Sequence, residues 1–406
     1  MATVKPFGAY RPTKELVHKV AALPYDVMNT QEASEIVKNN SYSFLNIDKP
    51  EIHVKDPSND ALYKYAAHTL DKMIEDQILV QDEESFYIYG LHNQYTSQYG
   101  LVCCVSTDEY NKGIIKKHEN TRADKELDRI KHVTYCKAHT GPIFLAYKGI
   151  EDFTAWMMTY IKDNHALYSF TADDNVVHEI YKISDKKAIE FIKNKFMQLD
   201  SLYIADGHHR AAAAASVANN FDHAHALNDE YKYFLAVAFP KDQLYIMDYN
   251  RVLKDESGLT EEELFKRLNQ IFDIESIDAP YYRPSKRHTF GMRYNKKWFS
   301  LSLKSEIVDE DDVIARLDVA ILQNYVLEPL FHISDPRNDK RIDFVGGIRG
   351  IEELNTRTNT DMDVAFSMYP TSMDELILVA DASKLMPPKS TWFEPKLRSG
   401  LFIHKI

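Results

Sequence analysis

The sequence predicts an α+β protein with two or three folding units. Segments with apolar residues at helical spacing are interspersed with short apolar runs typical of strands, and two of these runs are joined by a polar turn, as in a hairpin. The length of 406 residues gives two or three domains at about 150 residues per domain. Hydrophobic residues make up 44% and charged residues 27%, which is typical of a globular chain and argues against global disorder.

The first 250 residues supply most of the expected elements. Leu62, Ala66 and Leu70 recur near helical spacing, and the run from Ala211 to Ala218 is rich in the residue with the highest helix propensity. Helices are expected at 60–76, 152–162, 185–197 and 211–218. Strands are expected at 86–89, 99–105, 176–183, 202–205 and 234–239, the first two forming the hairpin.

Beyond residue 251 the pattern changes. Thr260 followed by Glu263 has the form of a capping box, which predicts a helix running to Ile271. The remaining expected elements are a strand pair over 289–303, a long helix over 311–330, a strand at 364–368 and a helix at 373–382. We place boundaries near 110 and 252, which gives an N-terminal α/β region (1–110), a middle region (111–252) and a C-terminal α/β region (253–406).

Charge and composition favour a small-molecule ligand. The net charge is −12, and a DNA-binding surface needs lysines and arginines on phosphates, so nucleic acid is an unpromising partner. Cys103, Cys104 and Cys136 have no metal-site or redox spacing and are expected to be buried packing residues. The start of the sequence has no signal-peptide layout, and no apolar run reaches the roughly 20 residues of a membrane span. These features predict a cytoplasmic protein without membrane contact.

The segment Asp206-Gly207-His208-His209-Arg210 lies between an expected strand and an expected helix. Glycine permits a sharp turn, and the first backbone N–H groups of the helix, through Ala211, would form an anion site at the positive end of the helix dipole. Arg210 adds a bidentate phosphate donor, and Asp206 is suited to Mg²⁺. Together these residues predict a nucleotide-phosphate site that differs from the P-loop and Rossmann patterns.

Simpler interpretations of the histidines and the turn stay open. Adjacent histidines can form a solvated helix cap, and Asp-Gly is a common turn pair. A zinc site using both imidazoles is less suitable, because neighbours on a helix point about 100° apart. His223 and His225 could chelate a metal from a strand, although surface histidines are the simpler interpretation.

A second polar cluster covers 116–122, where Glu119 lies among cations that would hold it ionised, as a general base requires. A solvated, charged helix start is the alternative. Loop-like clusters around Tyr25, Arg251 and Lys389 are weaker candidates, since turn chemistry also explains them. The weaker candidates for substrate contact are His118, Asn120, Thr121, Asn250, Arg251 and Lys389.

These motifs carry two resemblances. His118-Glu119 and the Asp206–Arg210 turn resemble the ParB/sulfiredoxin-type free serine kinases over about 115–250. From about 5 to 403 the chain also resembles a bacterial family of conserved, largely uncharacterised proteins, whose marks here are Pro24-Tyr25-Asp26-Val27, His118-Glu119-Asn120-Thr121, Asp128-Arg129, the Asp-Gly-His-His-Arg turn and Met386-Pro387-Pro388-Lys389-Ser390-Thr391.

The kinase resemblance implies a ParB/sulfiredoxin-like core in the middle region and an Mg²⁺-dependent kinase that phosphorylates free L-serine with ATP or ADP. Glu119 would match the residue that takes the proton from serine, and Asp206 would lie near metal and substrate. Gly207, His208, His209 and Arg210 would hold the nucleotide phosphates. This chain departs from the compact kinases in the long segment between Glu119 and Asp206. A nucleotide-binding ParB-like sensor without enzymatic activity, or a nucleotide or phosphoester hydrolase, are the alternatives.

Overall fold

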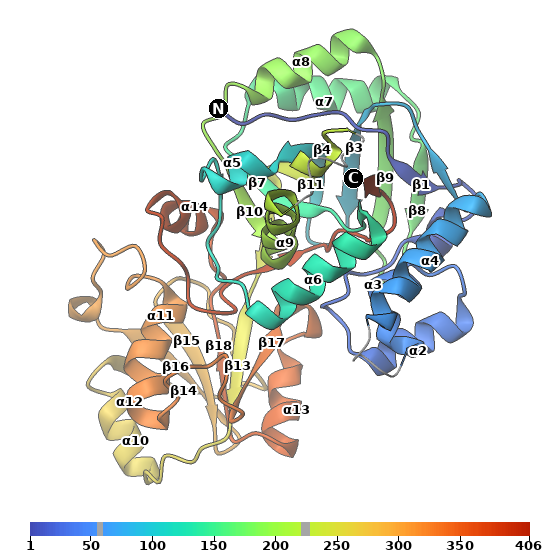
Figure 1. Cartoon of the computed structure of the whole chain (residues 1–406). Coiled ribbons are helices and arrows are strands. Elements are labelled where there is room, and N and C mark those ends of the chain that lie inside the picture. The colour runs from blue at the N-terminus through green and yellow to red at the C-terminus, as the bar shows by residue number, and fades with distance from the viewer. Residues whose placement is uncertain (55–59, 221–227) are drawn as a thin grey trace. The chain divides into compact units, whose positions relative to one another are not determined.

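The computed structural model describes residues 1–54, 60–220 and 228–406 (Figure 1); His223 and His225 lie outside them. Its contacts define two compact units. Unit 1 comprises Met1–Lys117, Thr121–Leu244 and Pro395–Ile406, and unit 2 comprises His118–Asn120 and Tyr245–Glu394. Among the described residues, no helix is both long and apolar enough to cross a membrane.

Unit 1 contains a mixed sheet and helices on its surface. Its strands are β1 Tyr10–Pro12, β2 Leu79–Gln81, β3 Phe86–His92, β4 Ser97–Ser106, β5 Ile115–Lys116, β6 Ala138–His139, β7 Ile143–Tyr147, β8 Tyr168–Thr171, β9 Val177–Ile183, β10 Leu202–Asp206, β11 Tyr233–Pro240 and β20 His404–Lys405. Its helices are α1 Val17–Val20, α2 Thr30–Asn39, α3 Leu45–Asp48, α4 Ala61–Glu75, α5 Thr107–Asn111, α6 Ala123–Cys136, α7 Glu151–Asp163, α8 Lys186–Phe196 and α9 His208–Asn219.

Eight strands form the main sheet, in the order β5-β10-β7-β11-β4-β3-β9-β8. The predicted hairpin is confirmed, because β3 and β4 pair antiparallel with Tyr87 opposite Val102. β10 is parallel to β5 at Leu202 and Tyr203 and antiparallel to β7, which it pairs with as far as Asp206. Its first residues therefore lie between two strands, and its last residue lies beyond the pairing with β5.

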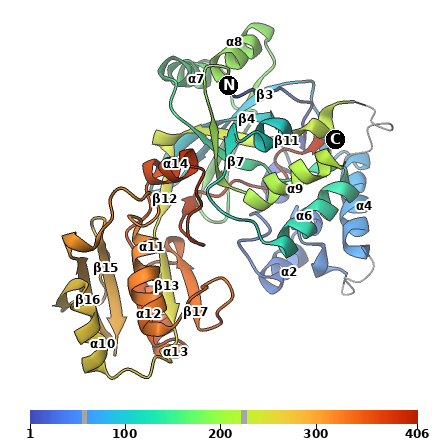
Figure 2. The ribbon, with the colours of Figure 1, turned by 60° about the vertical axis from the view of Figure 1, so that its left-hand side comes forward.

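Unit 1 contains two hydrophobic cores. One joins a face of the sheet to α7, α8 and α9, through side chains such as Phe153, Phe196 and Ala214. The other gathers residues of α2, α3, α4 and α6 with Ile403 near the end of the chain. α6 packs along α9, as both views show (Figures 1 and 2). The cysteines at 103, 104 and 136 are buried and form no disulfide, as predicted.

Unit 2 contains a six-stranded antiparallel sheet in the order β14-β16-β15-β18-β13-β17. The strands of unit 2, of which β12 and β19 form a separate pair, are β12 Tyr245–Met247, β13 Tyr249–Leu253, β14 Phe272–Ile277, β15 Thr289–Tyr294, β16 Lys297–Leu303, β17 Ile342–Gly346, β18 Val364–Ser367 and β19 Trp392–Glu394. The helices of unit 2 are α10 Glu261–Leu268, α11 Asp318–Leu322, a π-helical segment Gln323–Leu327, α12 Glu328–Phe331, α13 Glu352–Thr360 and α14 Met373–Asp381.

The division into units differs from the expected regions. No break occurs near residue 110, because β4, which ends at Ser106, pairs over Leu101–Ser106 with β11 (Tyr233–Pro240) in one sheet. The expected boundary near 252 falls at 244–245. The C-terminal segment from Pro395 returns to unit 1, which local sequence patterns could not reveal.

The expected long helix over 311–330 was wrong in its first part. Residues 310–317 form bends and turns, and the α-helix begins only at Asp318. The Asp312 side chain accepts hydrogen bonds from the backbone N–H groups of Ile314 and Ala315. Such local bonds offer the backbone an alternative to the helical pattern.

Candidate functional site

The Asp206–Arg210 turn has the predicted strand-turn-helix form. β10 ends at Asp206, Gly207 has φ 94°, and α9 begins at His208. A positive φ of this size is readily available only to glycine. The N–H group of Ala211 donates to the carbonyl oxygen of Gly207, so the expectation that this N–H group belongs to the anion site was wrong. The backbone N–H groups of residues 208–210 have no acceptor within α9, because they lie in its first turn.

The Asp206 carboxylate is held by two donors within unit 1. One oxygen accepts from the backbone N–H group of Gly207 at 3.0 Å, and the other lies 3.2 Å from Lys396 Nζ. Burial favours the neutral acid, but Lys396 and then Arg210 and His208 outweigh it and hold the pKa of Asp206 well below its usual range. Asp206 is therefore an anion at any physiological pH, which is the state that a metal ligand requires.

Lys396 was missed by sequence reasoning. It lies 190 residues after Asp206 in the chain and follows a short strand of unit 2, so no local motif joins the two residues. The structure brings them together because the last segment, Pro395–Ile406, belongs to unit 1.

Arg210 lies at the first turn of α9 beside a small polar cavity. Its guanidinium donates to the carbonyl oxygen of Pro142 at 2.6 Å. The cavity has a volume of about 20 Å³, which suits a single water molecule. Its polar wall includes the side chains of Tyr25, Asp48, Arg129, His132, Thr140 and Arg210.

The residues that line this cavity include members of the turn and of two other sequence motifs, 24–27 and 128–129. The Arg129 guanidinium lies 4.1 Å from the centre of the Tyr25 ring and pairs with Asp128 at 2.6 Å. Burial raises the pKa of Tyr25, so its hydroxyl stays neutral. Residues 24–27, 128–129 and 206–210, which are far apart in the sequence, thus meet around Arg210 in unit 1.

His209 has a contact that the sequence did not predict. Its Nε2 atom accepts a hydrogen bond from the backbone N–H group of Arg122 at 3.0 Å. An accepting Nε2 carries no proton, so only Nδ1 of this ring could donate to a phosphate. His209 therefore also positions the start of α6.

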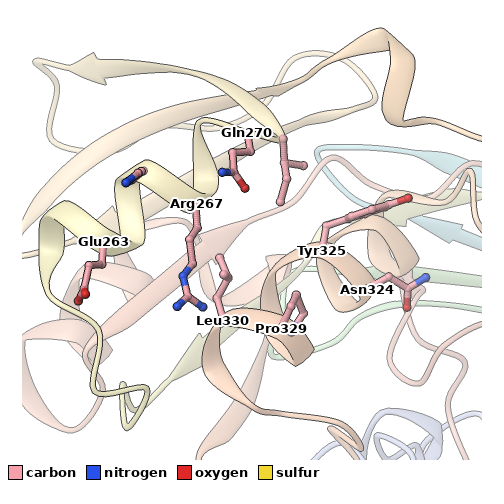
Figure 3. Close-up of a pocket in the computed structure, with 9 residues that line it drawn as sticks. Glu263, Arg267, Gln270, Asn324, Tyr325, Pro329 and Leu330 are labelled. Carbon is pink, nitrogen blue, oxygen red and sulfur yellow. The ribbon is translucent and has the colours of Figure 1, made fainter.

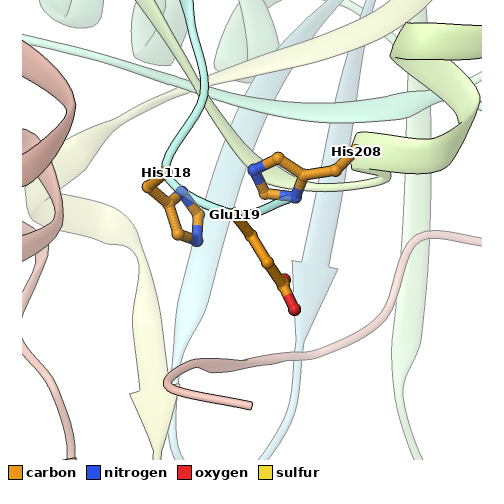
Figure 4. Close-up of side chains that lie close together, drawn as sticks. All are labelled: His118, Glu119 and His208. Carbon is orange, nitrogen blue, oxygen red and sulfur yellow. The ribbon is translucent and has the colours of Figure 1, made fainter. Parts of the chain in front are cut away.

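Figure 4 draws the side chains of His118 and Glu119, which belong to unit 2, and of His208, which begins α9 in unit 1. His118 and His208 are buried, and Glu119 is partly exposed.

The other weak candidates fall in separate places. Asn120 is exposed, and the Thr121 hydroxyl donates to Glu126 at 2.6 Å. Asn250 is buried in unit 2, where its carboxamide oxygen accepts from the backbone N–H group of Met368. Asn250 therefore has a structural role in the unit 2 sheet.

A wider cavity of about 670 Å³ lies in unit 2, between α10 and the π-helical segment (Figure 3). Glu263 and Arg267 extend from α10, Gln270 from the turn that follows it, and Asn324 and Tyr325 from the opposite wall. None of the predicted site residues is among those that line it. Its polar wall is largely exposed, so it provides no desolvated site for catalysis.

Solved structures with similarity to the chain include a free serine kinase mutant in complex with ADP, with 14% identity, a TM-score of 0.38, and coverage of 72% of this chain and 87% of that one. A conserved hypothetical protein from Pyrococcus furiosus has 15% identity and a TM-score of 0.36, over 73% and 93% of the chains. SbnI from Staphylococcus aureus, truncated at its C-terminus, has 11% identity and a TM-score of 0.39, over 73% and 85%. Such TM-scores support no transfer of activity or ligand.

The sequence itself was also compared with characterised proteins and with protein families. No curated protein matches it. Residues 4–320 match the family described as "Protein of unknown function (DUF1015)". This match covers well over half of the chain, and the protein belongs to that family.

Proposed function

We propose that the protein is an Mg²⁺-dependent kinase that transfers a phosphoryl group from ATP or ADP to the hydroxyl group of free L-serine, giving O-phosphoserine. The observation that carries the proposal is the Asp206–Arg210 turn, in which a glycine with positive φ joins a buried strand to a helix start beside an arginine and an ionised carboxylate. Serine as the acceptor comes from the motif resemblance to the free serine kinases, as does the ParB/sulfiredoxin-like core.

The turn would bind the nucleotide phosphates. The backbone N–H groups at the start of α9 and the positive end of its dipole attract an anion. Gly207 lacks a side chain, so a phosphate oxygen can approach the backbone closely. Arg210 keeps donors beyond the one bonded to Pro142, and these would contact phosphate oxygens. His208 and the Nδ1 atom of His209 would complete the phosphate site.

Asp206 would be the metal ligand and Glu119 the general base. The ionised Asp206 carboxylate fits Mg²⁺, which prefers hard oxygen donors. When bound, Mg²⁺ would neutralise charge on the phosphoryl group during transfer. Glu119 would accept the proton of the serine hydroxyl, so that the oxygen can attack in line with the bond that breaks.

The kinase test is direct. The full chain is incubated with Mg²⁺-ATP or Mg²⁺-ADP, with and without L-serine, and O-phosphoserine is measured by mass spectrometry. We expect product only with serine present. Serine-independent release of phosphate would instead indicate a hydrolase, and nucleotide binding without any turnover would indicate a sensor.

Glu119→Gln tests the base. We expect turnover to fall about 10²–10⁴-fold, the usual contribution of a general base, while the Kd for nucleotide measured by calorimetry changes little. Asp124→Asn, an exposed carboxylate on the neighbouring helix, is the matched control and should leave turnover unchanged. Normal turnover in Glu119→Gln would refute the role of Glu119.

A further inference from the structure

Arg251 is a buried cation on β13 of unit 2. Its exposed fraction is 3%, and none of the described carboxylates forms an ion pair with it. Burial lowers the pKa of Arg251 to about 10, so the side chain is still charged at neutral pH. A buried charge without a counter-charge lowers stability, because the interior solvates it less well than water does.

Other buried arginines of the structure have compensating partners. Arg129 pairs with Asp128 at 2.6 Å, and Arg398 pairs with Asp174. Arg293, on β15, has no carboxylate either, but it donates to the side chains of Thr358 and Asn359 on α13. The β-sheet register places Arg251 opposite Phe366 and Arg293 opposite Ala365, so the two arginines point to opposite faces of the sheet.

Only some of the N–H donors of the Arg251 guanidinium group form hydrogen bonds to described residues. It donates to the backbone carbonyl oxygens of Tyr249 and, at 3.0 Å, of Lys389. A guanidinium has five N–H donors, so three have no partner among the described residues. Its carbon atom lies 5.4 Å from the centre of the Phe344 ring, which holds the planar group in a fixed orientation.

Lys389 lies at the surface beside the Arg251 guanidinium group. Its side chain is exposed, and its backbone carbonyl oxygen accepts the bond from Arg251. The loop is fixed in place, since the Ser390 hydroxyl donates to Pro387 and the Ser390 carbonyl oxygen accepts from Thr371. The buried guanidinium group of Arg251 and the exposed ammonium group of Lys389 therefore both lie at the 387–390 loop.

We infer that unit 2 contains a second binding site, in which the guanidinium group of Arg251 holds the carboxylate or phosphate group of a small ligand. A carboxylate or phosphate would accept two parallel N–H bonds from the fork and supply the missing negative charge. Lys389 would attract the ligand from solvent. This inference does not depend on the kinase assignment.

The test uses the full chain carrying Arg210→Ala, which should weaken phosphate binding at the Asp206–Arg210 turn because it removes the bidentate donor. Thermal unfolding is measured in sodium phosphate and in sodium acetate, against sodium chloride at equal ionic strength. We expect one or both anions to raise Tm, and the responding anion identifies phosphate or carboxylate as the bound group. Adding Arg251→Met should abolish the rise, whereas adding Arg293→Met, the matched control, should leave it.

The stability of the anion-free protein is a second readout. If Arg251 serves a ligand, Arg251→Met should unfold at the same or a higher temperature than its parent, because it removes an uncompensated charge. If Arg251 only fixes the 387–390 loop, the variant should unfold at a lower temperature and the parent should show no anion response. That combination, or an anion response that persists in Arg251→Met, would overturn the inference.

Arg251→Lys covers the case in which the methionine variant does not fold. Lysine retains the charge but lacks the planar fork, so the Kd for the responding anion, measured by calorimetry, should rise at least about tenfold. An unchanged Kd would also overturn the inference. If the wild-type chain forms no O-phosphoserine while the anion response is intact, the kinase proposal alone is refuted.

Discussion

Two aspartates show how local charge decides the state of a carboxyl group. Asp206 is held ionised because Lys396 and Arg210 outweigh its burial. Asp318 in unit 2 shows the opposite balance: burial is dominant and raises its pKa to about 7, although the backbone N–H group of His288 donates to both carboxyl oxygens. The first arrangement suits a permanent anion, and the second gives a group that titrates near neutrality.

Asp318 should make the folded protein less stable as pH rises. An unfolded aspartate has a pKa near about 3.9, so stability is full below that pH and falls as pH rises through about 7, where the native carboxyl group must ionise while buried. The loss is about 3–4 kcal/mol for a shift of roughly three units. Asp318→Asn should remove this pH dependence.

Urea unfolding at pH 5 and pH 8 measures the effect. Wild type should lose stability between the two values by more than Asp318→Asn does. Asp311→Asn, an exposed aspartate in the preceding turn, is the control and should behave as wild type. Equal losses in all three proteins would show that Asp318 does not titrate in this range.

At the scale of single elements, the junction of β10 and α9 depends on Gly207. Its φ of 94° is one constraint, and space is the other: a Cβ atom there would lie 3.1 Å from the guanidinium nitrogens of Arg210. A side chain at this position would therefore both strain the backbone and displace the proposed phosphate donor.

Gly207→Ala and Gly258→Ala separate these two effects. Gly258 also has a positive φ, of 72°, but a Cβ atom there would have no neighbour within 4 Å. Each substitution should lower the free energy of unfolding by about 1–2 kcal/mol through backbone strain. Only Gly207→Ala should weaken nucleotide binding, by about tenfold through displaced charge-assisted bonds. Calorimetry with ADP would contradict this if both variants bound equally.

Elements with apolar stripes were predicted well, and elements with polar buried faces were not. The helix at 185–197 and the strand at 202–205 correspond to α8 and β10. α6 was missed because its buried face includes Arg129 and His132, and hydrophobic periodicity cannot detect such a face.

The candidate site was predictable only where its residues are adjacent in sequence. The Asp206–Arg210 turn combines a glycine, an aspartate and an arginine between a strand and a helix, which is a local signal. Lys396 carries no such signal, because its effect on Asp206 arises from tertiary contact across the whole chain. The roles assigned to Glu119 and the nucleotide-binding residues stay predictions.

At the scale of the whole molecule, unit 1 is assembled from segments distant in sequence. β20, near the end of the chain, pairs antiparallel with β6. The buried Phe402 ring lies 5.0 Å from that of Tyr87 and 6.1 Å from that of Tyr89 on β3. Residues 395–406 thus complete the packing of a sheet whose strands come from the first 240 residues.

Phe402→Ala should destabilise unit 1 in particular. Truncating a buried phenylalanine costs about 3–5 kcal/mol, so amide hydrogen exchange measured by mass spectrometry should accelerate in β3 and β4 and stay unchanged in β13. Leu354→Ala, in the core of unit 2, is the matched variant and should show the reverse pattern. Uniform acceleration by either variant would mean that the two units unfold together.

The position of Lys396 also has a consequence for synthesis on the ribosome. Translation proceeds from the N-terminus, and folding can begin before it ends. A nascent chain that ends before Pro395 already contains the Asp206–Arg210 turn and all of unit 2, but it lacks the ammonium group that lies beside Asp206. The electrostatic environment of the turn is therefore completed only when the segment that contains Lys396 has been added.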